Sequence, residues 1–278
     1  MLEPLPTLRK PDRPAAAFAR SLPASAAFDW LAGGWRDLWA APWPSLAYGL
    51  FLTLVSYAVL WALQASHMLY LALPAVSGFL IVGPFLAIGL YEKSRRQADG
   101  QSIALSDMLT FRPASGAQLA YAGLLLGLLI LFWLRAADLL YALFFGLTPF
   151  PGAADALINA FTTPQGWALI ATGTLVGGLF AAFAFAISVF SVPMLVSRRT
   201  DALTAMGLSF AMTVQNLKPM LAWGAVVAAG LALSLLTGLV GLIILFPVLG
   251  HGTWRAYTAI AGASSSTSGL SSRAEMKV

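Results

Sequence analysis

The sequence contains no cysteine and very little charge. Without cysteine the chain can form no disulfide, thiolate metal site or iron–sulfur cluster, and it has no cysteine nucleophile. Charged residues make up 10% of the chain and hydrophobic residues 59%, whereas about 25% of the residues in soluble domains are charged. This composition excludes a soluble globular domain and indicates a membrane protein.

Motifs of known catalytic sites are missing as well. There is no HExxH zinc motif, no P-loop and no GxSxG serine motif. The two histidines, His67 and His251, lie in segments predicted on opposite faces of the membrane. This placement argues against a bis-histidine haem or a histidine-rich metal centre. We therefore expect no cofactor and no metal, and the chain is not predicted to be an enzyme.

Apolar runs near the ~20 residues that cross a bilayer recur along the chain. They predict an all-α polytopic membrane protein with six transmembrane helices at about 45–65, 68–91, 117–145, 167–196, 220–237 and 239–258. The expected organisation is a flexible cytoplasmic arm (1–27), a transmembrane domain (28–258) and a disordered, serine-rich cytoplasmic tail (259–278).

One pattern recurs three times, at about 28–96, 105–199 and 201–255. Each unit has an amphipathic stretch, an ascending span, and a descending span that contains a proline and ends on basic residues. The prolines, predicted to kink the descending helices, are Pro84, Pro193 and Pro247. The pattern predicts three parallel helical hairpins with interfacial amphipathic helices.

The first amphipathic stretch, Phe28 to Ala41, is predicted to lie in the membrane interface or to pack on the helix bundle. Gly33 and Gly34 favour a break within it.

Basic residues predict the orientation of the helices. All of the 16 lysines and arginines except Arg135 fall on one predicted side. By the positive-inside rule both termini are expected in the cytoplasm. The basic residues that end the descending spans could also contact lipid headgroups. They include Lys93, Arg95, Arg96, Arg198 and Arg199. Because the net charge of +5 resides in these loops, we expect the lipid bilayer as the partner and not nucleic acid.

Four ionisable residues are candidate functional or partner contacts. Arg135 and Asp138 lie three residues apart and can form an ion pair near the outer end of the third span, where it would be structural or would contact a substrate or partner. His251 lies between Gly250 and Gly252. Either it forms a structural hydrogen bond with a neighbouring helix, or it relays protons or contacts a cofactor or a partner. Glu92 is predicted to be an interfacial charge paired locally.

The chain resembles a bacterial integral membrane family known as domain of unknown function 2189. The pieces that carry the resemblance are 34–37 (GWRD), 83–92 (GPFLAIGLYE), 133–135 (WLR), 140–146 (LYALFFG), 191–195 (SVPML), 201–206 (DALTAM) and 247–254 (PVLGHGTW). The family has no established activity, but some members carry a label that links them to cytochrome c oxidase. This sequence lacks the paired-histidine helices of a haem–copper catalytic subunit, so the resemblance implies at most an accessory role beside a respiratory complex.

Together these features predict a non-catalytic protein of the bacterial inner membrane. It would act as an accessory, assembly or stabilising subunit that packs against other membrane subunits. The alternative is a small-molecule or lipid transporter or channel, in which kinked helices gate a path lined by His251, Glu92 and Arg135.

Overall fold

The computed structural model describes residues 18–68, 72–146 and 152–262, and within them every regular element is a helix. The helices are α1 (Ala26–Ala40), α2 (Pro42–Ala65), α3 (Ala72–Leu86), α4 (Ile88–Ala98), α5 (Leu105–Thr110), α6 (Gly116–Phe145), α7 (Ala153–Thr162), α8 (Pro164–Ser188), α9 (Ser191–Ser197), α10 (Ala202–Gln215), α11 (Leu217–Leu236) and α12 (Leu242–Ala261). The predicted all-α class is therefore confirmed.

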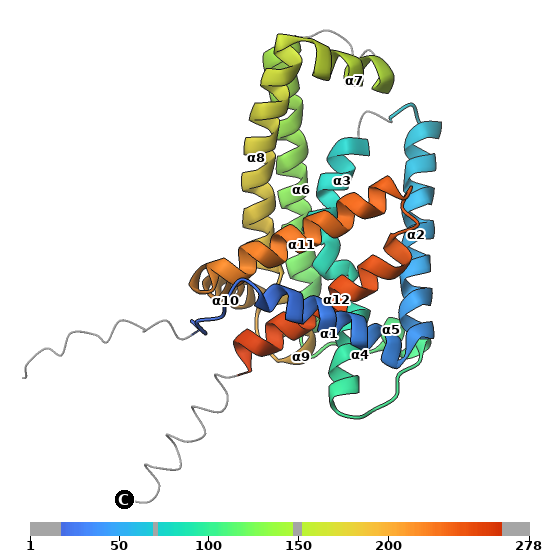
Figure 1. Ribbon diagram of the computed structural model, residues 1–278, viewed down its shortest axis with the longest axis vertical. Helices are drawn as coiled ribbons and strands as arrows, with labels where there is room; N and C mark the ends of the chain where they lie inside the picture. The colour runs from blue at the N-terminus through green and yellow to red at the C-terminus, as the bar shows by residue number, and fades with distance from the viewer. Residues whose placement is uncertain (1–17, 69–71, 147–151, 263–278) are drawn as a thin grey trace, which may run out of the picture.

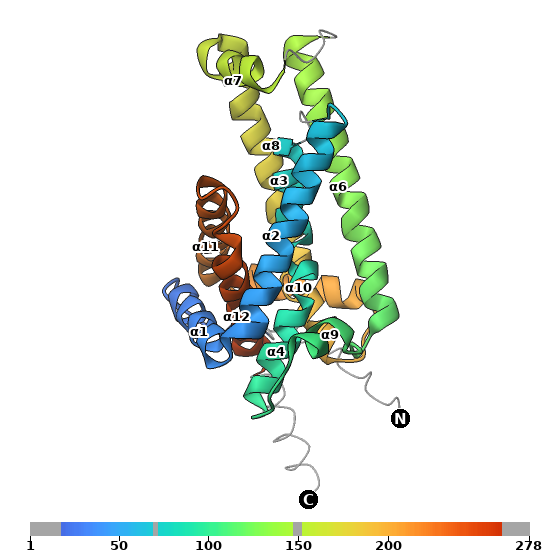
Figure 2. The same ribbon diagram turned by 90° about the vertical axis from the view of Figure 1, so that its right-hand side faces the viewer.

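Four helical segments are long and apolar enough to cross a bilayer: Pro42–Ala65, Gly116–Phe145, Pro164–Ser197 and Leu217–Leu236. Helices α6 and α8 run side by side along the long axis of the molecule, and α2 follows the same direction on the other side of α3. Helices α11 and α12 form an oblique hairpin whose tip lies below the far ends of α6 and α8 (Figures 1 and 2). Helix α12 is not among the four, because Gly250, His251 and Arg255 dilute its apolar character. The structure supports four candidate spans, and the six-span arrangement stays a prediction.

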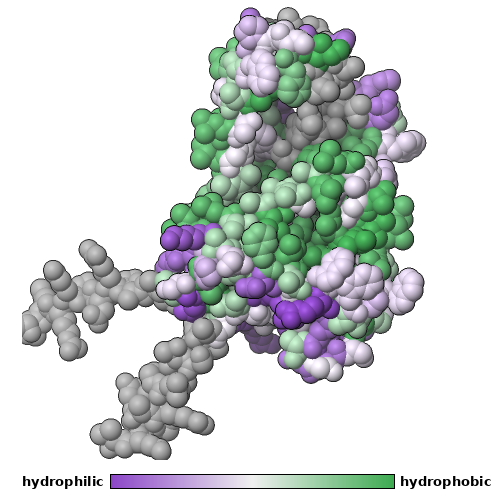
Figure 3. All heavy atoms as spheres, viewed as in Figure 1, coloured by the Kyte–Doolittle hydropathy of each residue, from purple (hydrophilic) through white to green (hydrophobic). Residues whose placement is uncertain are grey.

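Hydropathy divides the surface of the molecule into zones. Figure 3 shows a broad apolar belt across the middle of one face and hydrophilic residues gathered beneath it, near α1 and α10. The spans α2, α6 and α11 bury only 22% of their most apolar windows inside the chain, compared with 61% for Pro164–Ser197. Most of the apolar surface of these three helices is therefore left for the bilayer or for another protein.

Two of the three descending prolines lie beside a break in the helix. Helix α3 ends two residues after Pro84, and Ala87 separates it from α4. Helix α8 ends at Ser188, and Pro193 follows within the first turn of α9. Helix α12, in contrast, continues through Pro247. The carbonyl of Leu86, at the end of α3, accepts a hydrogen bond of 2.8 Å from the Tyr48 hydroxyl, which satisfies a group that a helix end leaves free.

Glycines allow other helices to lie directly on α12. A Cβ atom at Gly34 of α1 would be 2.2 Å from the Val248 carbonyl oxygen, and one at Gly49 of α2 would be 2.3 Å from the Ile243 carbonyl oxygen. Both neighbouring groups belong to the α12 backbone and cannot move aside like a flexible side chain. Close backbone approach of this kind is the role of small residues between membrane helices.

The expected break at Gly33 and Gly34 is wrong. Helix α1 continues through both glycines, and both are buried. Glycine weakens an isolated helix, but here the contact with α12 needs positions without a side chain. Helix α1 packs on α12 and α11, while Phe28, Trp35 and Trp39 remain exposed.

The described part of the predicted flexible arm is held in place. The Phe18 amide donates to Gln215 Oε1 (2.9 Å), the Arg20 amide donates to Asn216 Oδ1 (3.0 Å), and the Arg20 side chain reaches the Ile260 carbonyl (2.9 Å). These bonds fasten the residues before α1 to α10 and α12. The predicted arm is therefore wrong for residues 18–27, and its first 17 residues lie outside the described residues. Helix α12 extends to Ala261, slightly into the predicted tail, most of which also lies outside them.

The α1–α12 contact gives a first prediction. In Gly34→Ala the new methyl group would meet the α12 backbone, so we expect a loss of about 1–3 kcal/mol in the free energy of unfolding. The matched control is Gly207→Ala on α10, where a Cβ atom meets nothing within 4 Å and helix propensity favours alanine by up to about 1 kcal/mol. Thermal unfolding in detergent, followed by tryptophan fluorescence, measures both variants. Equal melting temperatures for Gly34→Ala and the wild type would show that α1 is not held against α12.

Candidate functional site

The strongest candidate site is a buried polar cluster around His251 in α12. The His251 side chain is fully buried. Its Nε2 lies 2.9 Å from Ser45 Oγ of α2, and its Nδ1 lies 2.7 Å from Ser94 Oγ of α4. One imidazole ring therefore links three helices that are far apart in the sequence.

The flanking glycines explain how α12 reaches its neighbours at this level. A Cβ atom at Gly250 would be 2.6 Å from Leu90 Cδ1 of α4, and one at Gly252 would be 2.5 Å from the Trp223 ring of α11. Because both glycines lack a side chain, α12 can pack against α4 and α11 on either side of His251.

Lys93 is the second member of the cluster, and it is fully buried. Its Nζ donates to Ser45 Oγ (2.5 Å), to the Ala41 carbonyl (2.7 Å) and to the Asp37 carbonyl (3.2 Å). The two carbonyls lie at the end of α1, where helix carbonyls lack partners and the helix dipole favours a cation. Lys93 thus caps α1 from α4, and all three N–H groups of its ammonium have acceptors.

An ion pair closes the cluster on the side of α1. The Arg255 guanidinium of α12 donates from Nε to Asp37 Oδ2 (2.9 Å) and from Nη2 to Asp37 Oδ1 (2.5 Å). This bidentate geometry is the strong form of an arginine–carboxylate contact. The Gln97 side-chain amide of α4 also donates to the Asp37 carbonyl (3.2 Å).

Counting donors assigns the protonation state of the imidazole. Since Lys93 donates to Ser45 Oγ, the Ser45 hydroxyl can give its own hydrogen to Nε2, which then acts as the acceptor. A neutral ring with its hydrogen on Nδ1 can donate to Ser94 Oγ, so both ring nitrogens have a partner. A protonated ring would place a second positive charge near Lys93, with only the Ser45 hydroxyl between the two. The geometry therefore favours a neutral His251 and a chain that runs from Lys93 through Ser45 and His251 to Ser94.

Burial also changes the acid–base behaviour of Lys93. It lowers the pKa of Lys93 from the usual 10.5 to about 8, and the carboxylate of Asp37 opposes part of this shift. The ammonium loses hydration on burial, and its bonds to the carbonyls and Ser45 replace only part of it.

Glu92, the residue before Lys93, faces different partners. Its carboxylate accepts hydrogen bonds from Arg95 (2.8 Å) and Arg96 (2.7 Å) of the same helix. Burial alone would raise the pKa of Glu92, but the hydrogen bonds and charges of the two arginines bring it below its usual value. The local pairing that the sequence suggested is present.

The other predicted contact residues lie away from the cluster. Arg135 and Asp138 form an ion pair of 3.2 Å on α6, with both side chains mostly exposed. Arg135 is 19 residues after Gly116, or about 28 Å along the helix, so it is remote from His251. Arg198 and Arg199 follow α9 and are exposed, and the Arg198 guanidinium lies 6.0 Å from the centre of the Tyr257 ring.

Sequence reasoning identified His251 but not its partners. Ser45 and Ser94 are single hydroxyls among apolar or charged neighbours, a pattern that is common in membrane helices. Lys93 was interpreted as a charge that fixes topology, because the next residues, Arg95 and Arg96, do face the surface in part. Helical spacing could have separated them, since Lys93 and Gln97 lie four residues apart on the side that faces Asp37.

The cluster contains no recognisable metal site. Within the described residues no group of three or more His, Cys, Asp or Glu side chains is arranged to hold a metal ion. In chemical terms, the cluster offers a short chain of hydroxyls around one imidazole, buried and bonded at both ring nitrogens.

The buried lysine predicts a pH dependence of stability. The folded protein releases the Lys93 proton near pH 8, whereas the unfolded chain keeps it to about pH 10.5, so the unfolded chain binds more protons in this window. Raising the pH through the window should therefore stabilise the fold, by at most about 3 kcal/mol. The difference between the unfolding free energies of the wild type and Lys93→Met should grow with pH between 8 and 10.5.

The control for this experiment is Lys218→Met, which removes an exposed lysine at the start of α11. Its stability should follow the wild-type pH curve in detergent. If the curve of Lys93→Met also runs parallel to that of the wild type, the ammonium is not buried as described.

Comparison with known proteins supports the membrane assignment. The model of a family described as "Predicted integral membrane protein (DUF2189)" matches residues 71–197. No curated protein and no solved structure matches the chain. The matched segment runs from α3 to α9 and includes Lys93 and Ser94, whereas His251 and the pieces at 34–37, 201–206 and 247–254 lie outside it. The resemblance seen in the sequence is confirmed for residues 71–197, which are similar to the DUF2189 family of predicted integral membrane proteins.

Proposed function

We propose that this integral membrane protein is a non-catalytic accessory subunit that stabilises or helps to assemble a larger membrane complex. One observation carries the proposal: apolar side chains remain exposed at the outer end of the molecule, beyond the length of α6 that a bilayer can cover.

The length of α6 shows where these side chains lie. Its first turn lies at the end of the molecule that carries the basic residues, which we call the basic side. This follows because Ser115, directly before the helix, donates to the Arg198 carbonyl (2.9 Å). From there to Arg135 the helix rises about 28 Å, close to the ~30 Å thickness of the hydrocarbon. The ten residues from Ala136 to Phe145 continue past that level.

Those last turns of α6 are mostly apolar and half-buried, with Leu139 and Leu143 exposed, and helix α7, which lies crosswise at the same end (Figure 1), exposes Ile158 and Phe161. The exposed fractions are 71% for Leu139, 74% for Leu143, 58% for Ile158 and 56% for Phe161. We call these four residues the outer apolar surface. Large apolar side chains exposed outside the hydrocarbon mark a surface that a partner covers. The adjacent Arg135–Asp138 pair would give such an interface a polar edge.

The buried cluster fits a structural role better than a chemical one. Both nitrogens of His251 have hydroxyl partners, and all three hydrogens of Lys93 have acceptors. Glu92 is bound by two arginines of its own helix. A catalytic or transport role would require one of these groups to exchange its partner for a substrate. The cluster instead joins α1, α2, α4 and α12 by side-chain bonds.

The proposal includes an orientation and a place. Both termini face the cytoplasm of a bacterium. Helix α3 with the first residues of α4, up to Tyr91, and helix α12 complete six spans in the inner membrane. The three hairpins α2/α3–α4, α6/α8–α9 and α11/α12 form one repeated unit. The order of elements supports this arrangement, because a short helix (α1, α5 or α10) precedes each hairpin. The partner implied by the resemblance is a respiratory complex.

A matched pair of variants tests the proposal. The protein is solubilised from its native membrane in a mild detergent and separated on native gels beside a respiratory oxidase. We expect the wild type to migrate with other membrane subunits in constant proportion. The double variant Leu139→Ser/Leu143→Ser should shift to the size of the free chain, because a polar surface no longer matches the partner.

The control variant is Leu124→Ala, which changes an exposed leucine on α6 at a level that the bilayer covers. It should migrate like the wild type. A wild-type chain that migrates alone, or only with copies of itself, contradicts the accessory role. Loss of the complex in both variants would show that the outer apolar surface is not the contact.

A further inference from the structure

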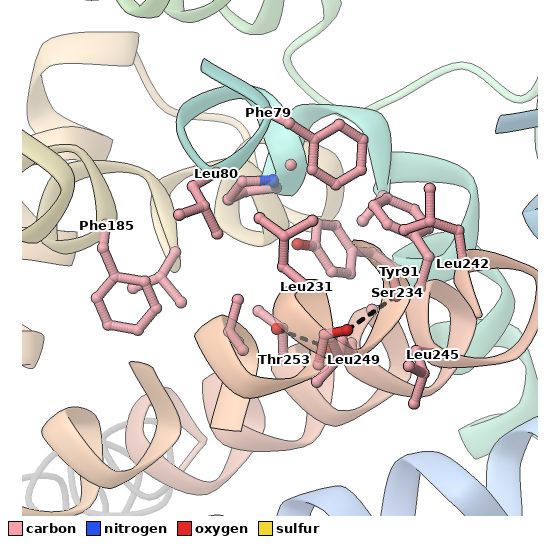
Figure 4. A pocket seen from close by; sticks show the side chains of 18 residues that line it. Phe79, Leu80, Tyr91, Phe185, Leu231, Ser234, Leu242, Leu245, Leu249 and Thr253 are labelled. Carbon is pink, nitrogen blue, oxygen red and sulfur yellow. Dashed lines mark hydrogen bonds between the residues drawn. The ribbon is translucent and has the colours of Figure 1, made fainter. Parts of the chain in front are cut away.

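A second feature of the molecule, separate from the polar cluster, is an apolar pocket between two groups of helices. The pocket is partly open, and the space between its lining residues, open space at its mouth included, is about 620 Å³. Helix α3 packs on α6 and α8, while α11 packs on α12 and α1, and the pocket lies at the seam between these groups. Figure 4 shows side chains from both sides of the seam around the space, among them Phe79, Phe185, Leu231, Leu245 and Leu249.

The few polar groups of the lining are already hydrogen-bonded. The Ser234 hydroxyl donates to the Gly230 carbonyl (2.8 Å), and the Thr253 hydroxyl donates to the Leu249 carbonyl (2.9 Å). The Tyr91 hydroxyl lies near the Thr253 side chain. A polar substrate entering the pocket would therefore lose water without gaining partners, whereas a hydrocarbon ligand would need none.

The size and position of the pocket match one leaflet of a bilayer. Its lining on α12 runs from Leu242 to Thr253, about 17 Å along this oblique helix. Its extent across the bilayer is therefore shorter than about 17 Å and comparable to the ~15 Å thickness of one leaflet of hydrocarbon. Tyr91, at one end, is two residues from Lys93 and four from Arg95. The pocket therefore extends from the basic side toward the middle of the apolar belt.

From these observations we infer that the pocket is a binding site for one acyl chain of a membrane lipid from the leaflet on the basic side. The chain lies along α12, between Phe79 of α3 and Leu231 of α11, and fills the seam that packing between the two helix groups leaves open. This site does not depend on the proposed accessory role.

Gly83 offers a way to fill the pocket without disturbing its walls. It lines the pocket, and a Cβ atom at this position would meet nothing within 4 Å. A larger side chain in Gly83→Leu can extend into the empty space and exclude an acyl chain. The matched control is Gly178→Leu on α8, where a Cβ atom also meets nothing within 4 Å but the residue does not line this pocket.

The test uses the purified full chain in liposomes of phosphatidylethanolamine and phosphatidylglycerol. A small fraction of the phosphatidylethanolamine carries a diazirine on its acyl chain, and after irradiation the adducts are mapped by mass spectrometry. In the wild type we expect adducts on pocket residues such as Leu231, Phe246 and Leu249, as well as on the exposed Leu236. Gly83→Leu should lose the pocket adducts and keep those on Leu236, and Gly178→Leu should resemble the wild type.

The wild-type pattern alone tests the site, even if a variant fails to fold. Adducts confined to exposed residues such as Leu236, with none on the pocket residues, would overturn the proposal. Lipid is the only ligand present in these liposomes, so a pocket that binds another kind of ligand would stay unlabelled. Pocket adducts that persist in a folded Gly83→Leu would overturn it as well. Comigration with respiratory subunits is not measured here, so failure of the lipid site leaves the accessory role to its own test.

Discussion

The fold depends on the close approach of backbones to α12 at positions that only glycine can occupy. Gly34 of α1 and Gly49 of α2 lie against α12 carbonyls. On α12 itself, Gly250 and Gly252 leave room for the side chains of Leu90 (α4) and Trp223 (α11). Without hydrophobic drive between helices inside a bilayer, such contacts supply much of the packing energy. This proximity also puts His251 within hydrogen-bond distance of serines on two helices. Packing and the polar cluster therefore share one cause.

The polar cluster around His251 shows how the charged side chain of Lys93 can be buried between helices. Lys93 loses its hydration, and its lowered pKa records that cost. The loss is offset by carbonyls at the end of α1 that would otherwise lack partners. The Asp37–Arg255 pair fixes the same end of α1 to α12. Removing one member would leave a buried partner unsatisfied, which costs more than the bond contributes, so the cluster favours one arrangement of α1, α2, α4 and α12 over looser ones.

Periodicity and composition predicted the class of the protein, its long helices, the prolines at the ends of α3 and α8, and the pairing of Arg135 with Asp138. These features depend on residues close in sequence. The partners of His251 could not be predicted, because Ser45 and Ser94 lie 206 and 157 residues away from it and only the packing of α12 brings them together. Gly33 and Gly34 were misinterpreted for the same reason: local propensity opposes a helix there, and a tertiary contact overrides it.

The two ends of the molecule are stabilised in different ways, and this difference links the proposed partner to the pocket. At the basic side, α1, α4 and α12 are joined by an ion pair, a capping lysine and glycine contacts. Above that level α11 and α12 diverge from α3 and α8, and the seam between them is mostly apolar, with its Ser234 and Thr253 hydroxyls already bonded to helix carbonyls. Farther out, α6 and α7 expose leucines and aromatics. Side-chain bonds join the helices at the polar end, whereas apolar surface stays uncovered at the seam and at the outer end. Lipid at the seam and protein at the outer end would cover the apolar surface that the chain's own helices leave open.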